Sequence, residues 1–370
     1  MKSQQLLLVG ALILIVGAIV YLQSQKVTVP GNGTSDTTIP LIASTMTTEE
    51  KAKKYERAKE ISTPDGFINT DAITISGLIG KKVILVDFWT YSCINCQRTT
   101  PYLNAWYDKY KDDGLEIIGV HTPEFEFEKK YGNVQQAVTN EQIAYPVVLD
   151  NDYSTWQAYG NRYWPRKYLI DIDGFIVYDH IGEGAYEETE QKIQAALAER
   201  MTRLGLTDSV ETSIAQPEGT YDPKAQSPEI YFGASRNQYL GNGSANKAGV
   251  QNFTAPKTVT PNTLYLSGTW DISDEFAQTK SAGAAALFQY TAQKVYMVAS
   301  GDSPVKVTVL IDGTAVGSLA GADVDPATST VTIHDERLYS LIDDPGGLSS
   351  HTLELIPETP GLQAFTFTFG

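Results

Sequence analysis

The order of apolar and polar positions divides the chain into three regions of different character. Residues 6–22 are almost continuously apolar, a length close to the minimum for a membrane-spanning helix. Lys2 precedes this run, no small-residue cleavage site follows it, and residues 23–44 are rich in Ser, Thr, Gly and Pro. We therefore expect residues 1–25 to be an uncleaved signal anchor with one transmembrane helix, in preference to a cleaved signal. This predicts a single-pass protein of the cytoplasmic membrane whose bulk is extracytoplasmic.

Strand and helix patterns alternate in the middle region. The apolar run KVILVDFW at residues 82–89 is typical of a buried central strand, and Asp173-Gly174 predicts a β-hairpin. A charged stretch at residues 47–60 predicts a short helix, and a solvated spacer is the alternative. The expected strands are 82–89, 115–121, 147–149, 166–172 and 175–181, and the expected helices are 96–111, 132–141, 155–159 and 187–203. This order predicts an α/β sandwich.

The pattern changes after a polar linker. Short apolar runs separated by Gly, Asp, Pro and Ser follow, which predicts an antiparallel β-sandwich. The expected strands are 263–267, 285–290, 294–299, 305–311, 330–333, 351–355 and 363–369. The predicted division is an anchor at 1–25, a tether and short helix at 26–64, an α/β domain at 65–204, a linker at 205–227 and an all-β domain at 228–370.

Charge and cysteine content narrow the function classes. The net charge of −16 provides no basic stripe for phosphate backbones, so nucleic acid is not an expected partner. Two cysteines, three positions apart, exclude a scaffold held by several disulfides. One CxxC and four scattered histidines do not supply the four ligands of a zinc site, so neither a metal nor another cofactor is expected.

The spacing of Cys93 and Cys96 favours redox chemistry over an inert bridge. The pair follows a buried strand directly and opens a helix, where free N–H groups and the helix dipole stabilise a thiolate. Cys93 is therefore the expected nucleophile, and Cys96, one turn further along, is expected to resolve the mixed disulfide. A structural disulfide that closes so short a loop would contribute little stability.

The run VDFWTYSCINC followed by QRTTP resembles the thioredoxin superfamily, in its extracytoplasmic TlpA-like and DipZ-type branch. The segments YPVVLD, AYGNRYWPRKYLID and the Asp-Gly hairpin resemble the same family in the same order, so the likeness covers about residues 65–200. The resemblance implies a thioredoxin fold and a thiol-disulfide oxidoreductase. Ile94-Asn95 stands where thioredoxin has Gly-Pro, so no redox potential is carried over.

The resemblance also assigns roles to residues outside the cysteine pair. Pro165 matches the cis-proline beside the active-site disulfide of the family. Trp164 and Trp89 are expected to contact substrate. Asp87 matches the buried acid that relays a proton to the inner cysteine, and Glu124 matches a glutamate that could be the base instead. A hydrogen-bonded structural aspartate and a solvated loop glutamate are the alternatives for these two acids.

The region 228–370 resembles the C-terminal domain of DipZ-type proteins, through segments such as YFGASRNQYL and LYLSGTWDI. The resemblance implies a jelly-roll sandwich similar to carbohydrate-binding modules. Glycan is therefore a possible partner, with Trp270 and Tyr239 as candidate aromatic platforms. DipZ-type proteins usually begin with a multi-span electron-transfer domain, whereas this chain has one apolar segment, so a separate CcdA-like membrane protein is the expected electron donor.

These features together predict a membrane-anchored reductase of disulfides in extracytoplasmic proteins, with apocytochromes before haem attachment as one candidate substrate. The same cysteine pair could run in the oxidising direction and form disulfides instead. A surface binding protein with an accessory redox domain is the alternative from a different class.

Overall fold

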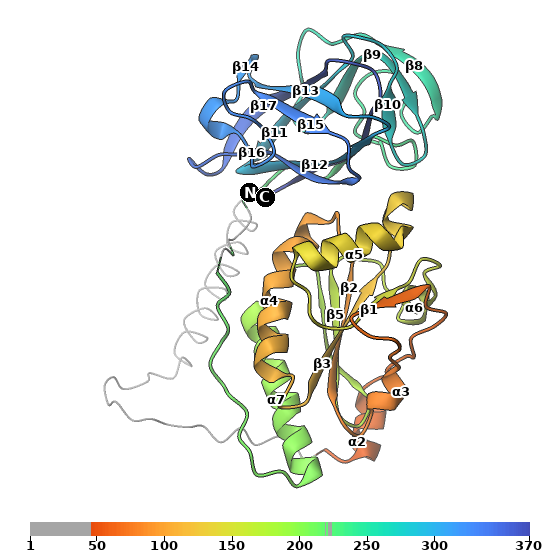
Figure 1. The fold of residues 1–370 in the computed structure, drawn as a ribbon, viewed down its shortest axis with the longest axis vertical. Coiled ribbons are helices and arrows are strands. Elements are labelled where there is room, and N and C mark those ends of the chain that lie inside the picture. The colour runs from red at the N-terminus through yellow and green to blue at the C-terminus, as the bar shows by residue number, and fades with distance from the viewer. Residues whose placement is uncertain (1–45, 219, 221–223) are drawn as a thin grey trace, which may run out of the picture. The chain divides into compact units, whose positions relative to one another are not determined.

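The computed structural model describes residues 46–218, 220 and 224–370 (Figure 1). The predicted anchor at residues 1–25 and the tether up to residue 45 lie outside the described residues. In the part of the chain that is described, no helix combines the length and apolar character that a bilayer crossing requires.

The first domain is built on a mixed sheet with the strand order β1-β4-β3-β2-β5-β6. The central strand β2 lies parallel to β3 and antiparallel to β5, and all seven of its residues are buried. A strand covered on both faces has to be apolar throughout, which explains the continuous run that predicted it. The strands are β1 (Gly66–Ile68), β2 (Val83–Trp89), β3 (Leu115–His121), β4 (Val147–Leu149), β5 (Arg166–Ile170) and β6 (Ile176–Ile181).

Helices cover both faces of this sheet. Leu85 and Trp89 pack with α4, α5 and α7, whereas Val86 and Phe88 pack with α3 and the region of α6 on the other face (Figure 1). The alternation follows from the period of two in a strand. The helices of the first domain are α2 (Thr48–Lys54), α3 (Ile75–Leu78), α4 (Ile94–Tyr110), α5 (Tyr131–Asn140), α6 (Ser154–Ala158), α7 (Tyr186–Leu204) and the 3-10 helix η1 (Glu126–Lys129).

The helix predicted at residues 47–60 is present but shorter than expected. The helix α2 begins after Thr47, whose side chain forms a capping box with Glu50, but it ends at Lys54. Beyond it the chain is extended, because its backbone pairs with the edge of β6 through the carbonyl of Glu56. Most of this segment is exposed to solvent, but Lys51 is 2% exposed and is bonded to three carboxylates of the first domain.

The second domain is all-β, as predicted. Its strands pair in the order β14-β13-β17-β11-β9-β10-β18-β12-β16, with β15 beside β13, β7 beside β18 and β8 beside β9. The strands are β7 (Ile230–Tyr231), β8 (Gly249–Phe253), β9 (Leu264–Ile272), β10 (Ala277–Thr279), β11 (Ala285–Ala292), β12 (Lys294–Gly301), β13 (Val305–Ile311), β14 (Thr314–Ala315), β15 (Thr330–Ile333), β16 (Arg337–Asp343), β17 (Ser349–Pro357) and β18 (Leu362–Phe369), with the 3-10 helix η2 (Gly317–Leu319).

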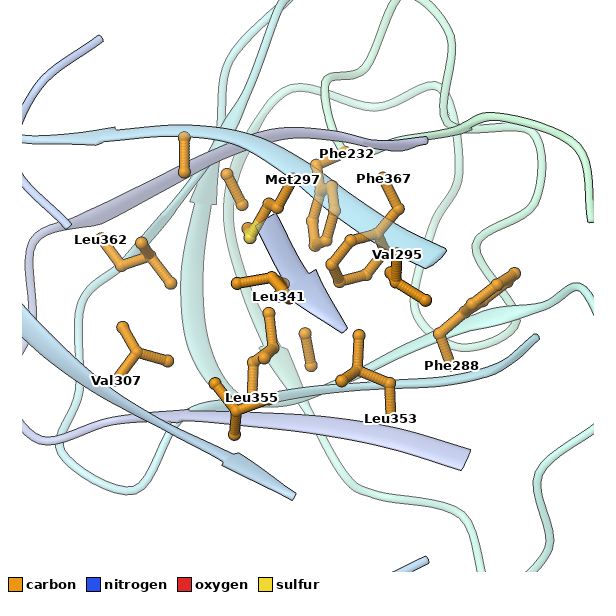
Figure 2. Close-up of a cluster of buried hydrophobic side chains, with 14 of the residues drawn as sticks. Phe232, Phe288, Val295, Met297, Val307, Leu341, Leu353, Leu355, Leu362 and Phe367 are labelled. Carbon is orange, nitrogen blue, oxygen red and sulfur yellow. The ribbon is translucent and has the colours of Figure 1, made fainter. Parts of the chain in front are cut away.

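The strand β9 connects the two layers of this domain. Its first residues pair with β11, and its residues from Gly268 onward pair with β8 or β10. Gly268 has φ +79°, and a Cβ there would lie 2.8 Å from the backbone of Ala284, so the change of layer requires glycine. Apolar side chains of the two layers, such as Leu355 and Phe367, fill the space between them (Figure 2).

The two domains share an apolar contact. Phe365 of β18 is 3% exposed and packs edge-on against Phe125 and Phe127, with ring centroids 5.1 and 4.9 Å apart. Beside it, Tyr91 Oη donates to the carbonyl of Glu336 at 3.0 Å. The loop after β3 and the turn before the cysteines are therefore fixed by the second domain.

Candidate active site

Cys93 and Cys96 lie where β2 passes into α4. Cys93 is the N-cap of α4, and its carbonyl accepts from the N–H groups of Cys96 at 3.1 Å and Gln97 at 3.0 Å. Both are free thiols, but Cys93 is partly exposed whereas Cys96 is 2% exposed. Burial raises the pKa of Cys96 well above its ordinary value, with contributions from the hydrogen bond to Cys93 and the charge of Asp87. The accessible thiol is thus Cys93, and Cys96 needs a proton acceptor before it can attack.

Asp87 lies on the face of β2 that α4 covers. It is 1% exposed, and its Oδ1 has no hydrogen-bond partner among the described residues. Burial raises the pKa of Asp87 from 3.8 to about 7, against the opposing charge of Lys167. An acid that titrates near neutrality beside a buried thiol is suited to proton transfer.

Lys167 is a residue of this site that the sequence analysis missed. It is the register partner of Asp87 on β5, it is fully buried, and its Nζ donates to the carbonyl of Gly182 at 3.2 Å. Burial lowers the pKa of Lys167, and the charges of Asp87 and Cys96 oppose that shift. The available signal was a lysine inside the strand expected at residues 166–172.

Trp164 forms a second side of the site, and the buried Pro165 follows it in the chain. The peptide bond between them is cis, the geometry expected for Pro165 from the family resemblance. The indole Nε1 of Trp164 donates to the carbonyl of Thr122 at 2.9 Å, and its ring lies 4.3 Å from that of Trp156. Trp164 is partly exposed and lines the same cleft as Cys93.

Trp89 is placed differently from what was expected. It is 2% exposed and belongs to the core, where its Nε1 would lie 3.0 Å from a Cβ added at Gly119. A direct contact with substrate is therefore a wrong expectation for Trp89, because a buried indole offers no surface to a second protein. His121, next to it, is also buried, and burial lowers its pKa to about 3, so its imidazole is neutral.

Glu124 lies in the loop after β3 and is not a solvated loop acid. Its Oε1 accepts from Arg236 Nη1 at 2.6 Å and lies 2.9 Å from Tyr231 Oη. Arg236 and Tyr231 belong to the second domain, so no local pattern in the sequence indicated them. Their side chains enter the site from a segment more than 100 residues away.

A cleft of about 510 Å³ brings these groups together. Cys93, Trp164 and Glu124 line it from the first domain, and Tyr231 and Arg236 line it from the second. Cys96 and Asp87 are not among its lining residues, in agreement with their burial. Cys93 thus faces the cleft, whereas Cys96 and Asp87 are buried away from it.

A second buried acid, Glu128 in η1, also escaped the sequence analysis. Its carboxylate accepts from the hydroxyl of Ser92 at 2.6 Å and from the N–H of Phe125 at 3.0 Å. Burial raises the pKa of Glu128 to about 7. The residue ties the turn before Cys93 to the loop that carries Glu124, a structural role that its hydrogen bonds account for.

The remaining sites to place are a metal site and an aromatic platform for glycan. Among the described residues, no group of three or more His, Cys, Asp or Glu side chains is arranged to hold a metal ion. Trp270 is fully buried in the second domain, which makes it unsuitable as a glycan platform, and Tyr239 is 37% exposed.

Comparison with known proteins gives relatives for both domains. Residues 55–197 match the Redoxin family, and residues 227–370 match a family described as thioredoxin like C-terminal domain. Protein DipZ of Mycobacterium bovis is 39% identical over 314 residues, which are 82% of this chain and 41% of DipZ. This chain therefore spans about two fifths of the length of that relative.

Two shorter relatives match the first domain. Thiol-disulfide oxidoreductase ResA of Bacillus thuringiensis is 31% identical over 148 residues, covering 39% of this chain and 80% of ResA. Thiol-disulfide oxidoreductase YkuV of Bacillus subtilis is 29% identical over 140 residues, covering 38% of this chain and 93% of YkuV. Together with the CxxC pair at a helix N-terminus and the cis peptide bond before Pro165, these matches show that the chain belongs to the thioredoxin superfamily, among the thiol-disulfide oxidoreductases related to DipZ and ResA.

Proposed function

We propose that this protein is a membrane-anchored, extracytoplasmic thiol-disulfide oxidoreductase that reduces disulfides in other proteins. The observation that carries the proposal is the difference between the two thiols, since Cys93 faces a cleft at a helix N-terminus and Cys96 is buried behind it. This asymmetry is what a two-step exchange needs, with one thiol to attack and one to resolve.

In the first step, the Cys93 thiolate attacks one sulfur of the substrate disulfide. The substrate S–S bond breaks, a mixed disulfide forms between Cys93 and the substrate, and the released sulfur takes up a proton. The N-terminus of α4 stabilises the attacking thiolate through its N–H groups and dipole. Trp164, which lines the cleft, and the cis peptide bond to Pro165 that follows it are proposed to position the substrate chain beside Cys93.

In the second step, Cys96 loses its proton and attacks the sulfur of Cys93. The mixed disulfide breaks, the Cys93–Cys96 disulfide forms, and the second substrate thiol leaves, so two electrons pass from the pair to the substrate. Asp87 is the proposed acceptor of the Cys96 proton, because its carboxylate is the acid whose charge acts on that thiol. Lys167 keeps part of the Asp87 population ionised at neutral pH.

The cycle closes when a dithiol reduces the new disulfide, and a separate CcdA-like membrane protein is the proposed donor. The proposal includes a membrane anchor at residues 1–25. It also includes domain boundaries that place the first domain at 65–204, the linker at 205–227 and the second domain at 228–370. The second domain is proposed to have a jelly-roll fold, and glycan binding by it stays a subordinate proposal. Retention of the protein on purified cell-wall glycans would support that proposal, and its absence would remove it.

The proposed function is tested with two cysteine variants. Cys93→Ser should abolish reduction of insulin disulfides, whereas Cys96→Ser should accumulate mixed disulfides that are resolved by added dithiol. Full activity of Cys93→Ser would refute the mechanism. The reduction potential of the pair then decides the direction, because about −270 mV is typical of a reductase and about −120 mV of a disulfide-forming oxidant.

A further inference from the structure

The contact between Glu124 and the second domain lies on the wall of the cleft that Cys93 faces. Arg236 Nη1 is 2.6 Å from Glu124 Oε1, and the guanidinium carbon of Arg236 is 3.8 Å from the ring centroid of Tyr231. Tyr231 Oη is 2.9 Å from Glu124 Oε1 and 2.9 Å from an oxygen of Glu229, which also lines the cleft. An ion pair and a stacked ring therefore hold one carboxylate in a defined place.

The loop that presents Arg236 is itself fixed. A Cβ at Gly233 would lie 2.2 Å from the backbone of Glu275, so this turn requires glycine to approach the neighbouring loop. The N–H of Ala234 donates to Ser273 at 2.8 Å, and the N–H of Arg236 donates to Gly233 at 3.0 Å. A cation carried by a rigid loop keeps its position relative to the cleft, as a positioning residue must.

The charged side chains of this wall line the same cleft as Cys93. Three arginines and three glutamates line the cleft, so their charges balance when all six are ionised: Arg98, Arg162, Arg236, Glu124, Glu183 and Glu229. Without the guanidinium of Arg236 the lining would carry one net negative charge, and like charges disfavour a neighbouring thiolate. The side chain of Glu124 is 13% exposed and that of Arg236 is 39% exposed, so solvent screens the pair only in part.

We propose that Arg236 of the second domain is a positioning residue for thiol-disulfide exchange, which holds Glu124 on the cleft wall and compensates its charge opposite Cys93. The proposal rests on the proposed function, because it assumes that the Cys93 thiolate is the attacking group. It makes the second domain part of the active site, since the first domain alone supplies the acid and not its counter-charge.

The test measures the rate at which iodoacetamide alkylates Cys93 in the reduced full-length protein, at pH 7 and low salt. Mass spectrometry assigns the modification to one of the two cysteines. Arg236→Gln should slow alkylation about fivefold, the effect expected for one added negative charge across a solvated cleft. Glu124→Gln should accelerate it by a similar factor, because the cation then remains without its acid.

The double variant separates charge from folding. Arg236→Gln combined with Glu124→Gln restores the original charge of the wall, so alkylation should return to within about twofold of the unsubstituted protein. Lys130→Gln is the matched control, because Lys130 forms another ion pair between the domains, at 2.7 Å to Glu336, but does not line this cleft. It should change the rate by less than about twofold.

Two results would overturn the inference. One is a double variant that remains as slow as Arg236→Gln, which would show that a disturbed fold and not charge is responsible. The other is equal rates for Arg236→Gln and Lys130→Gln, which would reduce Arg236 to one of several docking contacts. If Arg236→Gln does not fold, the opposite sign expected for Glu124→Gln still decides the question. Failure of the proposed function would instead appear as undiminished insulin reduction by Cys93→Ser.

Discussion

Replacement of Asp87 by Asn tests whether the buried acid near the cysteines lowers the stability of the folded protein. Asp87 is 1% exposed, and burial raises its pKa from 3.8 to about 7. Between these values the native state binds more protons than the unfolded chain, so stability falls as the pH rises through this window. Well above pH 7, the whole pKa shift lowers the free energy of unfolding by about 4 kcal/mol. A little under half of this destabilisation is already present at pH 5. Asp87→Asn should therefore gain about 2–3 kcal/mol more stability at pH 9 than at pH 5.

The difference between the two pH values is the quantity to measure. Asp87→Asn also leaves the buried Lys167 without its opposite charge, which lowers the gain at both pH values. Urea unfolding can be followed by tryptophan fluorescence, since four of the five tryptophans lie in the first domain. Asp108→Asn is the control, because the side chain of Asp108 is 71% exposed. An Asp87→Asn effect of equal size at pH 5 and pH 9 would refute the reasoning.

Three other substitutions have defined outcomes. Lys167→Met removes the positive charge that lowers the pKa of Asp87, so this pKa should rise beyond 7. The pH midpoint of mixed-disulfide resolution, measured by rapid quenching, should then increase by about one unit. Lys51→Met leaves Asp171, whose side chain is 1% exposed, without its cation and should cost about 3–5 kcal/mol in urea unfolding; an unchanged midpoint would contradict this. Phe365→Ala removes a ring buried between the domains and should cost about 3–5 kcal/mol and speed limited proteolysis, whereas a wild-type digestion pattern would count against that contact.

The elements that could be predicted from sequence are those whose burial leaves a local pattern. Residues 115–121 were expected as a strand and form β3 with the same bounds, because both faces of this strand are covered. The strand expected at residues 263–267 continues to Ile272 as β9. The continuation was missed because Gly268, where the strand changes layer, interrupts the apolar pattern. The strand β16 (Arg337–Asp343) was not expected, since polar residues interrupt its buried positions.

The residues of the candidate site also differ in whether a local sequence pattern indicates them. The cysteine pair, the buried acid and the cis-proline all lie within the segments that carry the family resemblance, so sequence motifs indicated them. Lys167 and Arg236 depend on contacts that a motif does not contain. The first reaches Asp87 through strand register, and the second reaches Glu124 across 112 positions of the chain.

The structure also separates the two acids that the sequence left as alternatives for one role. Asp87 is buried on the side of Cys96, and its charge acts on that thiol, whereas Glu124 lines the cleft with Cys93. Glu124 Oε1 is also 2.6 Å from Nη1 of Arg236, in a charge-assisted contact. We therefore propose that Asp87 takes up the proton of Cys96, and that Glu124 with its partner Arg236 sets the charge near Cys93. If both proposals hold, the resolving step depends on the first domain alone, and the attacking step depends on both domains.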